Sequence, residues 1–190
     1  MEVLLSIMIT AVIVLIIGGA VRLSFSSVEK GERRMEYLER IRASLNIIDS
    51  QIQSEIPLIE DSQNGKKYYF RGEKDFMRFA SNYSVWSGQK GYVDVSYKAA
   101  SDYYGKLTLF ETESVVGTSM ERKVKLLDGL DSLSFEYFYK GPTDEKGRWV
   151  DQWTDDTNMP EKIKLHIGYG EKDLSLIIPL RARRSLSEAM

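Results

Sequence analysis

The sequence contains no cysteine and only one histidine among its 190 residues. The absence of cysteine excludes a disulfide framework, a thiolate metal site and a cysteine nucleophile. The 26 basic and 28 acidic residues nearly balance at a formal charge of −2, which does not favour nucleic-acid binding. No phosphate-binding glycine loop, zinc-ligand spacing or nucleophile elbow is present. These absences favour a protein that is not an enzyme, uses no cofactor and binds no nucleic acid.

What the sequence does contain is a long uncharged run near its start, Val3 to Val21, bounded by Glu2 and Arg22. As a helix rising ~1.5 Å per residue, this run nearly covers the ~30 Å hydrocarbon core of a bilayer. No basic residue precedes it, as one would in a secretory signal peptide. The run therefore predicts a membrane anchor. Its large aliphatic side chains are Val3, Leu4, Leu5, Ile7, Ile9, Val12, Ile13, Leu15, Ile16 and Ile17.

A helical pattern continues past Arg22, where apolar residues recur at spacings of three and four and charged residues fill the other positions. Ser26 and Glu29 have the spacing of a capping box, and Gly18 and Gly19 are points where the helix could bend. Ile56 precedes Pro57, so the helix is predicted to end there. The apolar face is formed by Met35, Leu38, Ile41, Leu45, Ile48 and Ile52.

After Pro57 the pattern changes to short alternating runs separated by turn residues, which predicts a mostly antiparallel sheet domain. The fold class is therefore α+β, one long N-terminal helix followed by a sheet. We expect four parts: residues 1–22 in the membrane, 23–57 as an amphipathic continuation, 58–182 as the sheet domain and 183–190 as a tail. The predicted strands are 67–71, 76–80, 92–98, 106–111, 122–127, 133–140, 162–169 and 174–180.

Three features of the sheet domain are candidate functional sites. His166 alternates with Lys164 opposite the apolar face of its strand, so we expect it to face solvent. A loop with Asp151, Asp155 and Asp156 offers oxygen ligands for calcium, but its spacing does not match a calcium-binding loop, which favours a solvated loop. Trp149 and Trp153 flank this loop. They either cap the core, the preferred interpretation, or contact a partner.

Glu2 is the residue that links the run to a known family. Read alone, a carboxylate beside a lipid-soluble run marks the water boundary. Yet Met1 to Ser6 resembles the end of the motif that opens mature type IV pilins and pseudopilins, in which a glutamate precedes an apolar helix. The C-terminal half is similar to the J-type minor pseudopilin of type II secretion. The similar segments are Leu127–Tyr137, Trp149–Trp153 and Met159–Leu165.

The resemblance implies a pilin-like fold and a minor pseudopilin at the tip of a periplasmic filament. It implies anchoring in the inner membrane by a single pass, with the C-terminal domain in the periplasm. The expected partners are the I-type and K-type minor pseudopilins, the major pseudopilin, the inner-membrane assembly platform and membrane lipid. In a filament, the resemblance implies that Glu2 pairs with the terminal amine of an adjacent subunit and that the apolar run packs in the filament core.

Two alternatives remain: a minor pilin of a type IV pilus or DNA-uptake filament, which has the same physical basis, and an anchored periplasmic binding module that does not polymerise, for which Glu2 is dispensable. Pilins carry a basic leader and further residues before the glutamate, where this sequence has only Met1. Arg22, Lys30, Arg33 and Arg34 follow the run, so charge alone predicts a cytoplasmic domain. The resemblance predicts a periplasmic one, because an upstream leader would supply the cytoplasmic charge.

Overall fold

The computed structural model describes residues 2–62, 65–86, 92–115, 120–141 and 144–181. Met1 and the predicted tail at residues 183–190 lie outside these ranges. Packing divides the chain into two compact units, residues 1–43 and residues 44–190. An N-terminal helix followed by mostly antiparallel sheets confirms the α+β class.

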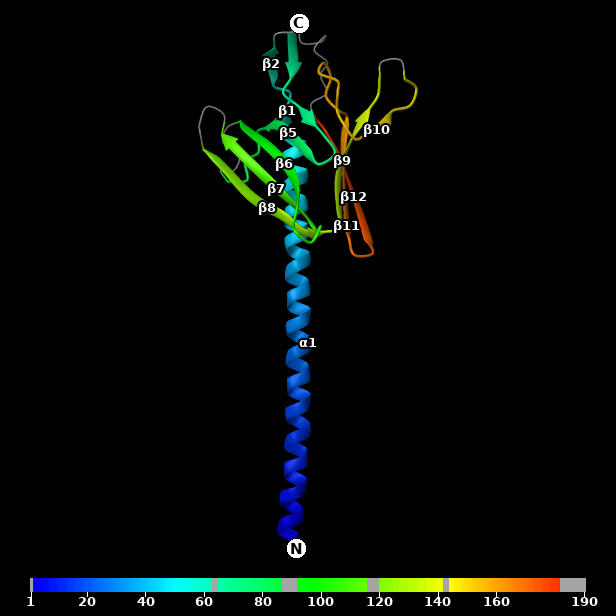
Figure 1. The fold of residues 1–190 in the computed structure, drawn as a ribbon. Helices are drawn as coiled ribbons and strands as arrows, with labels where there is room; N and C mark the ends of the chain where they lie inside the picture. Colours follow the sequence, from blue (N-terminus) through cyan, green and yellow to red (C-terminus); the bar gives the residue numbers. More distant parts are fainter. Residues whose placement is uncertain (1, 63–64, 87–91, 116–119, 142–143, 182–190) are drawn as a thin grey trace. The chain divides into compact units, whose positions relative to one another are not determined.

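Helix α1 (Glu2–Gln53) is unbroken in the structure, blue to cyan in Figure 1. It passes through Gly18, Gly19 and Ser26, so the helix does not unwind at these residues and no helix begins at the capping-box sequence. The helix ends three residues before the predicted Ile56, because Glu55 and Ile56 form strand β1. The preference of the residue before proline for extended backbone explains this change.

The apolar face predicted for the second half of α1 is buried only in its last turns. Ile48 and Ile52 are fully buried in the unit of residues 44–190. Met35 and Leu38 are exposed. The last two turns of α1 therefore belong to the core of the sheet region.

The larger sheet, six-stranded within the described ranges, has the order β1-β5-β6-β7-β8, with β4 also paired to β5. Every pairing is antiparallel. Gly129 has a φ of 69° inside β8, so the predicted turn at this position is an irregularity within a longer strand. The strands are β1 (Glu55–Ile56), β4 (Arg71–Gly72), β5 (Phe76–Ser81), β6 (Val93–Ser101), β7 (Leu107–Val115) and β8 (Glu121–Leu130).

A second antiparallel sheet, with the order β10-β9-β11-β12 in the described part of the chain, follows in yellow to orange (Figure 1). Its strands are β9 (Ser132–Tyr139), β10 (Arg148–Val150), β11 (Lys162–Tyr169) and β12 (Lys172–Pro179). A hairpin of β2 (Ile59–Ser62) and β3 (Gly65–Tyr68) stands apart from both sheets. The sequence did not predict β1, β2 or β10.

The predicted strand 67–71 is wrong in one respect, because it is two strands. β3 ends at Tyr68 and pairs with β2, whereas β4 begins at Arg71 and pairs with β5. Between them, the Tyr69 amide donates to the Leu58 carbonyl at 2.8 Å. At residues 69–70 the chain therefore changes its partner strand from β2 to β5. An alternating sequence pattern cannot show such a change.

The two sheets share one core through aromatic contacts between their inner faces. Tyr97 of β6 stacks on Phe79 of β5 at 6.1 Å and lies 6.4 Å from Phe135 of β9. All three side chains are essentially fully buried. Burying an aromatic ring of this size is worth about 1.5–3 kcal/mol, so this trio is a main source of cohesion between the sheets.

The core also contains buried glutamates, including Glu55, Glu111 and Glu113. Burial raises the pKa of Glu55 to about 8. Burial also raises the pKa of Glu111 to about 7, opposed by a hydrogen bond from Gln51 and reinforced by the nearby charge of Glu113. Gln51 fixes the end of α1 here, because its Nε2 donates to Glu111 Oε1 at 3.3 Å. One carboxyl oxygen each of Glu55 and Glu111 has no hydrogen-bond partner among the described residues.

Candidate functional site

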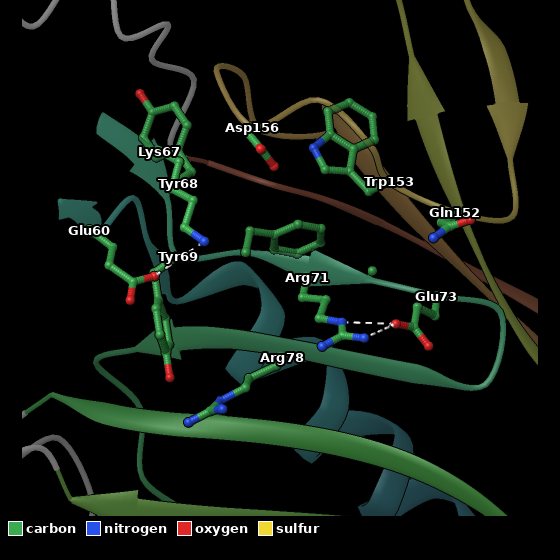
Figure 2. Close-up of a pocket in the computed structure, with 12 residues that line it drawn as sticks. Glu60, Lys67, Tyr68, Tyr69, Arg71, Glu73, Arg78, Gln152, Trp153 and Asp156 are labelled. Atoms are coloured by element: carbon green, nitrogen blue, oxygen red, sulfur yellow. Dashed lines mark hydrogen bonds and ion pairs between the residues drawn. The ribbon is translucent and has the colours of Figure 1, made fainter. Parts of the chain in front are cut away.

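A cavity of about 420 Å³ lies where the β2–β3 hairpin, strand β4 and the loop after β10 meet (Figure 2). Two backbone hydrogen bonds hold the loop against the strands. The Tyr68 amide donates to the Asp156 carbonyl at 3.0 Å, and the Trp153 amide donates to the Gly72 carbonyl at 2.9 Å. The pocket is therefore built by the same change of partner that separates β3 from β4.

Gly72 is required at this position by the close approach of a core side chain. A Cβ atom added there would lie 2.5 Å from Cζ of Tyr137. That ring is fully buried, and its hydroxyl donates to the Glu73 carbonyl at 2.9 Å. The floor of the pocket is thus fixed to the core of the second sheet.

Each basic side chain of the pocket already has an acidic partner. Arg71 donates from Nε and Nη2 to Glu73 Oε1 at 2.8 and 2.6 Å. Lys67 Nζ lies 3.8 Å from Glu60 Oε2. Figure 2 shows these two pairs on opposite sides of the pocket.

Arg78 is paired on the sheet side, where its Nε donates to Asp94 Oδ1 at 3.0 Å. The hydrogen bond that Arg78 donates to Asp94 raises the pKa of the Arg78 guanidinium. Tyr69 donates its hydroxyl to the same carboxylate at 3.1 Å. Burial and the Asp94 charge together raise the pKa of Tyr69 to about 12, so Tyr69 stays a neutral donor.

Trp153, predicted as a core cap or a partner contact, lines this pocket and is only partly buried. Its ring lies 5.8 Å from that of Tyr139, and its Nε1 donates to the Asn158 carbonyl at 3.1 Å. Phe70 adds a second ring, set edge-on to Tyr137 at 5.8 Å. The pocket therefore has an aromatic wall whose indole N–H is already used.

Trp149, the other predicted tryptophan, lies on β10 and does not line this pocket. Its ring contacts Phe138 at 5.2 Å, and Lys164 Nζ lies 3.9 Å from the ring centroid. Its contact with a partner stays a prediction.

His166 is 37% exposed and has partners that the sequence analysis did not identify. Its Nε2 lies 3.0 Å from Glu136 Oε2, and its Nδ1 lies 3.0 Å from Ser175 Oγ. Lys164 also donates to Glu136, and hydrogen bonds from Lys164 and His166 lower the pKa of that carboxyl. A nucleophile, a base and an orienting carboxylate thus meet here, but none of them lines the pocket beside Trp153. The expectation that the protein is not an enzyme remains a prediction.

The acidic loop does not assemble a cation site in the part of the chain that the structure describes. Asp155 accepts hydrogen bonds from Thr157 and Asn158 of its own loop. Partial burial opposes its ionisation, but those bonds outweigh it and hold its pKa below the usual range. Asp156 lines the pocket instead, and Asp151 is exposed.

The predicted membrane residues lie in a helical segment, Glu2–Phe25, that is long and apolar enough to cross a bilayer. Glu2 begins α1 as an acidic residue in its first turn. The large aliphatic side chains of the segment are exposed, among them Val3, Leu4, Leu5, Ile7, Ile9, Val12, Ile13, Leu15, Ile16 and Ile17.

Comparison with known proteins finds no matching family model, no matching curated protein and no matching solved structure.

Proposed function

We propose that this chain is a membrane-anchored filament subunit, a minor pseudopilin of the J type that supports protein secretion. The observation that carries the proposal is the contrast within α1. Its segment Glu2–Phe25 exposes its large apolar side chains, while Ile48 and Ile52 of the same helix are buried in a sheet core. An apolar surface of that size needs lipid or other helices around it.

In the proposed cycle, the segment first holds the subunit in the inner membrane, with the sheet domain in the periplasm. It then leaves lipid to pack against helices of the I-type, K-type and major pseudopilins on the assembly platform. Glu2 would neutralise the terminal amine of a neighbour in the apolar filament core. An ammonium left buried without its partner costs about 3–5 kcal/mol, enough to exclude a subunit from the filament.

The deciding experiment is complementation of a deletion strain with Glu2→Ala and Glu2→Gln variants. Both should reach the membrane at wild-type abundance, while secretion and cross-linking to other minor subunits fall about a hundredfold. Glu32→Gln is the matched control, since Glu32 is an exposed glutamate of the same helix outside the apolar segment. Full secretion by both Glu2 variants at equal abundance would refute the pairing.

Location can be tested separately, because the sequence has no cysteine of its own. Tyr103 is 97% exposed, so Tyr103→Cys supplies a single reactive thiol on the sheet domain. A membrane-impermeant maleimide should label it in cells whose outer membrane alone is permeable. Labelling only after the inner membrane is broken would place the domain in the cytoplasm.

A second candidate is an anchored binding module that does not polymerise, and the pocket beside Trp153 favours it. For such a module Glu2 is dispensable, and the apolar segment can be replaced by any spanning helix. The Glu2 variants therefore separate the two functions.

A further inference from the structure

The pocket beside Trp153 has a charge balance that restricts what it can bind. Lys67, Arg71 and Arg78 are paired with Glu60, Glu73 and Asp94 respectively. An anionic ligand would have to displace one of these carboxylates, and it would also be repelled by the carboxylate of Asp156, which lines the pocket without a basic partner among the described residues. A neutral ligand can be accommodated with every pair intact.

The same pocket keeps polar groups available for hydrogen bonding. Among the described residues, the Gln152 amide and the Asp156 carboxylate line it without a side-chain partner. Arg71 uses only its Nε and one Nη group toward Glu73, which leaves further N–H donors of its guanidinium. Donors and acceptors therefore stand around one cavity, as a ligand with several hydroxyl groups requires.

The aromatic wall gives the ligand an apolar face as well. Trp153 is held by Tyr139 and by its own N–H bond to Asn158, so it is in place before a ligand arrives. In Figure 2, Trp153 and Asp156 lie on the loop side, across from Arg71 and Glu73. Flat carbon–hydrogen faces edged by hydroxyls are the property of sugar rings.

We propose that this pocket binds a neutral saccharide, with a ring against Trp153 and its hydroxyls bonded to Gln152, Asp156 and Arg71. The volume of about 420 Å³ lies in the lower part of the ~300–1,000 Å³ range of small-ligand pockets, which suits one or two sugar rings. The proposal goes beyond the function proposed above and does not depend on whether the chain polymerises.

The test is saturation-transfer NMR on the full-length protein in lipid nanodiscs, which avoids detergents with sugar headgroups. Maltose, cellobiose and the disaccharide of N-acetylglucosamine are the neutral probes, and glucuronic acid is the anionic one. At least one neutral disaccharide should bind with a dissociation constant of about 1 mM, and glucuronic acid about tenfold more weakly. No transfer from any neutral probe at about 10 mM, or tighter binding of glucuronic acid, overturns the proposal.

Two loop variants place the binding at the pocket. Asp156→Ala should weaken it about tenfold, whereas Asp151→Ala, an exposed aspartate of the same loop outside the lining, should leave it unchanged. Trp153→Leu should abolish saturation transfer, and Trp149→Leu should not. Because Trp153→Leu could disturb the loop, the result with Asp156→Ala decides. Equal weakening by Asp151→Ala and Asp156→Ala would overturn the site, as would binding of an unstructured neutral peptide in place of the sugars.

Discussion

Between Glu2 and Phe25 the chain exposes apolar side chains, whereas between Gln51 and Glu113 it buries polar ones. Both arrangements oppose the usual distribution of residues in a soluble protein. The exposed segment is explained if water is not its solvent. The buried carboxyls of Glu55 and Glu111 are explained if they are protonated, as their raised pKa values indicate. The stability of the exposed apolar segment therefore depends on its surroundings, whereas the stability of the region with the buried carboxyls depends on pH.

The largest expected effect concerns the apolar segment. Replacing Val12 and Ile13 together by aspartate should cost about 5–7 kcal/mol of insertion free energy, at about 2.5–3.5 kcal/mol for each charge at a helix centre. The wild-type protein should stay in the pellet after alkaline carbonate washing, and the double variant should move to the supernatant. Leu38→Asp, an exposed position later in α1, is the control and should stay in the pellet. Retention of the double variant would contradict the anchor.

The next effect concerns the buried glutamates. A carboxyl whose folded-state pKa is raised binds its proton more tightly when folded. Its contribution to stability is therefore complete below its unfolded pKa near 4.5 and is lost as the pH rises through the folded value. For Glu111 that window runs from 4.5 to about 7, and for Glu55 from 4.5 to about 8. The free energy of unfolding of the sheet region should fall over these windows by about 3 kcal/mol for Glu111 and about 5 kcal/mol for Glu55.

Glu111→Gln and Glu55→Gln test whether these two carboxyls cause the stability to fall as the pH rises. Each variant should unfold at higher urea concentration than the wild type at pH 8 and show a smaller loss of stability between pH 5 and pH 8. Chemical denaturation at a series of pH values measures both. Glu121→Gln, at an exposed position on β8, is the control and should keep the wild-type slope. A wild-type stability that rises from pH 5 to pH 8 would contradict protonation of these carboxyls.

The long elements could be predicted from the sequence, because their periodicity is local. The apolar run, the amphipathic turns around Ile48 and Ile52, and the alternation along β9 and β11 each lie within one element. The short strands β1, β2 and β10 could not, since two to four residues show no period and these strands form only by pairing with partners elsewhere.

The residues of the candidate sites also include some that the sequence could predict and some that it could not. Trp153 was predicted as a candidate, but Arg71 and Gly72 entered the pocket through the register of β4 with β5, which no local pattern reveals. Ser175, the partner of His166 on β12, could have been predicted from the sequence. A hairpin whose two turn residues are Gly170 and Glu171 places residue 166 opposite residue 175, as the structure does.

A smaller effect is expected from adding one methyl group to the pocket floor. Gly72→Ala forces a Cβ against the Tyr137 ring, which is buried and held by a hydrogen bond to the Glu73 carbonyl. Overpacking of this kind costs about 1–3 kcal/mol. The unfolding midpoint of the sheet region should fall by several degrees in a thermal scan. An unchanged midpoint would show that the ring can move aside.

The smallest effect comes from the same substitution in the other region. Gly31 lies inside α1, and an added Cβ there has no atom within 4 Å beyond its own helix and neighbours. Alanine in a helix interior is favoured over glycine by about 0.5–1 kcal/mol, so Gly31→Ala should strengthen the helix locally. Amide exchange of nearby residues should slow by roughly two- to fivefold, at about 1.4 kcal/mol per factor of ten. The midpoint of the sheet region should stay within the error of the scan, because Gly31 lies outside the unit that begins at Ser44. If Gly72→Ala lowers stability while Gly31→Ala raises it locally, Gly72 is retained because a larger side chain does not fit, whereas Gly31 only weakens its helix. A fall in the midpoint with Gly31→Ala would instead show that its side of α1 is packed against a neighbour.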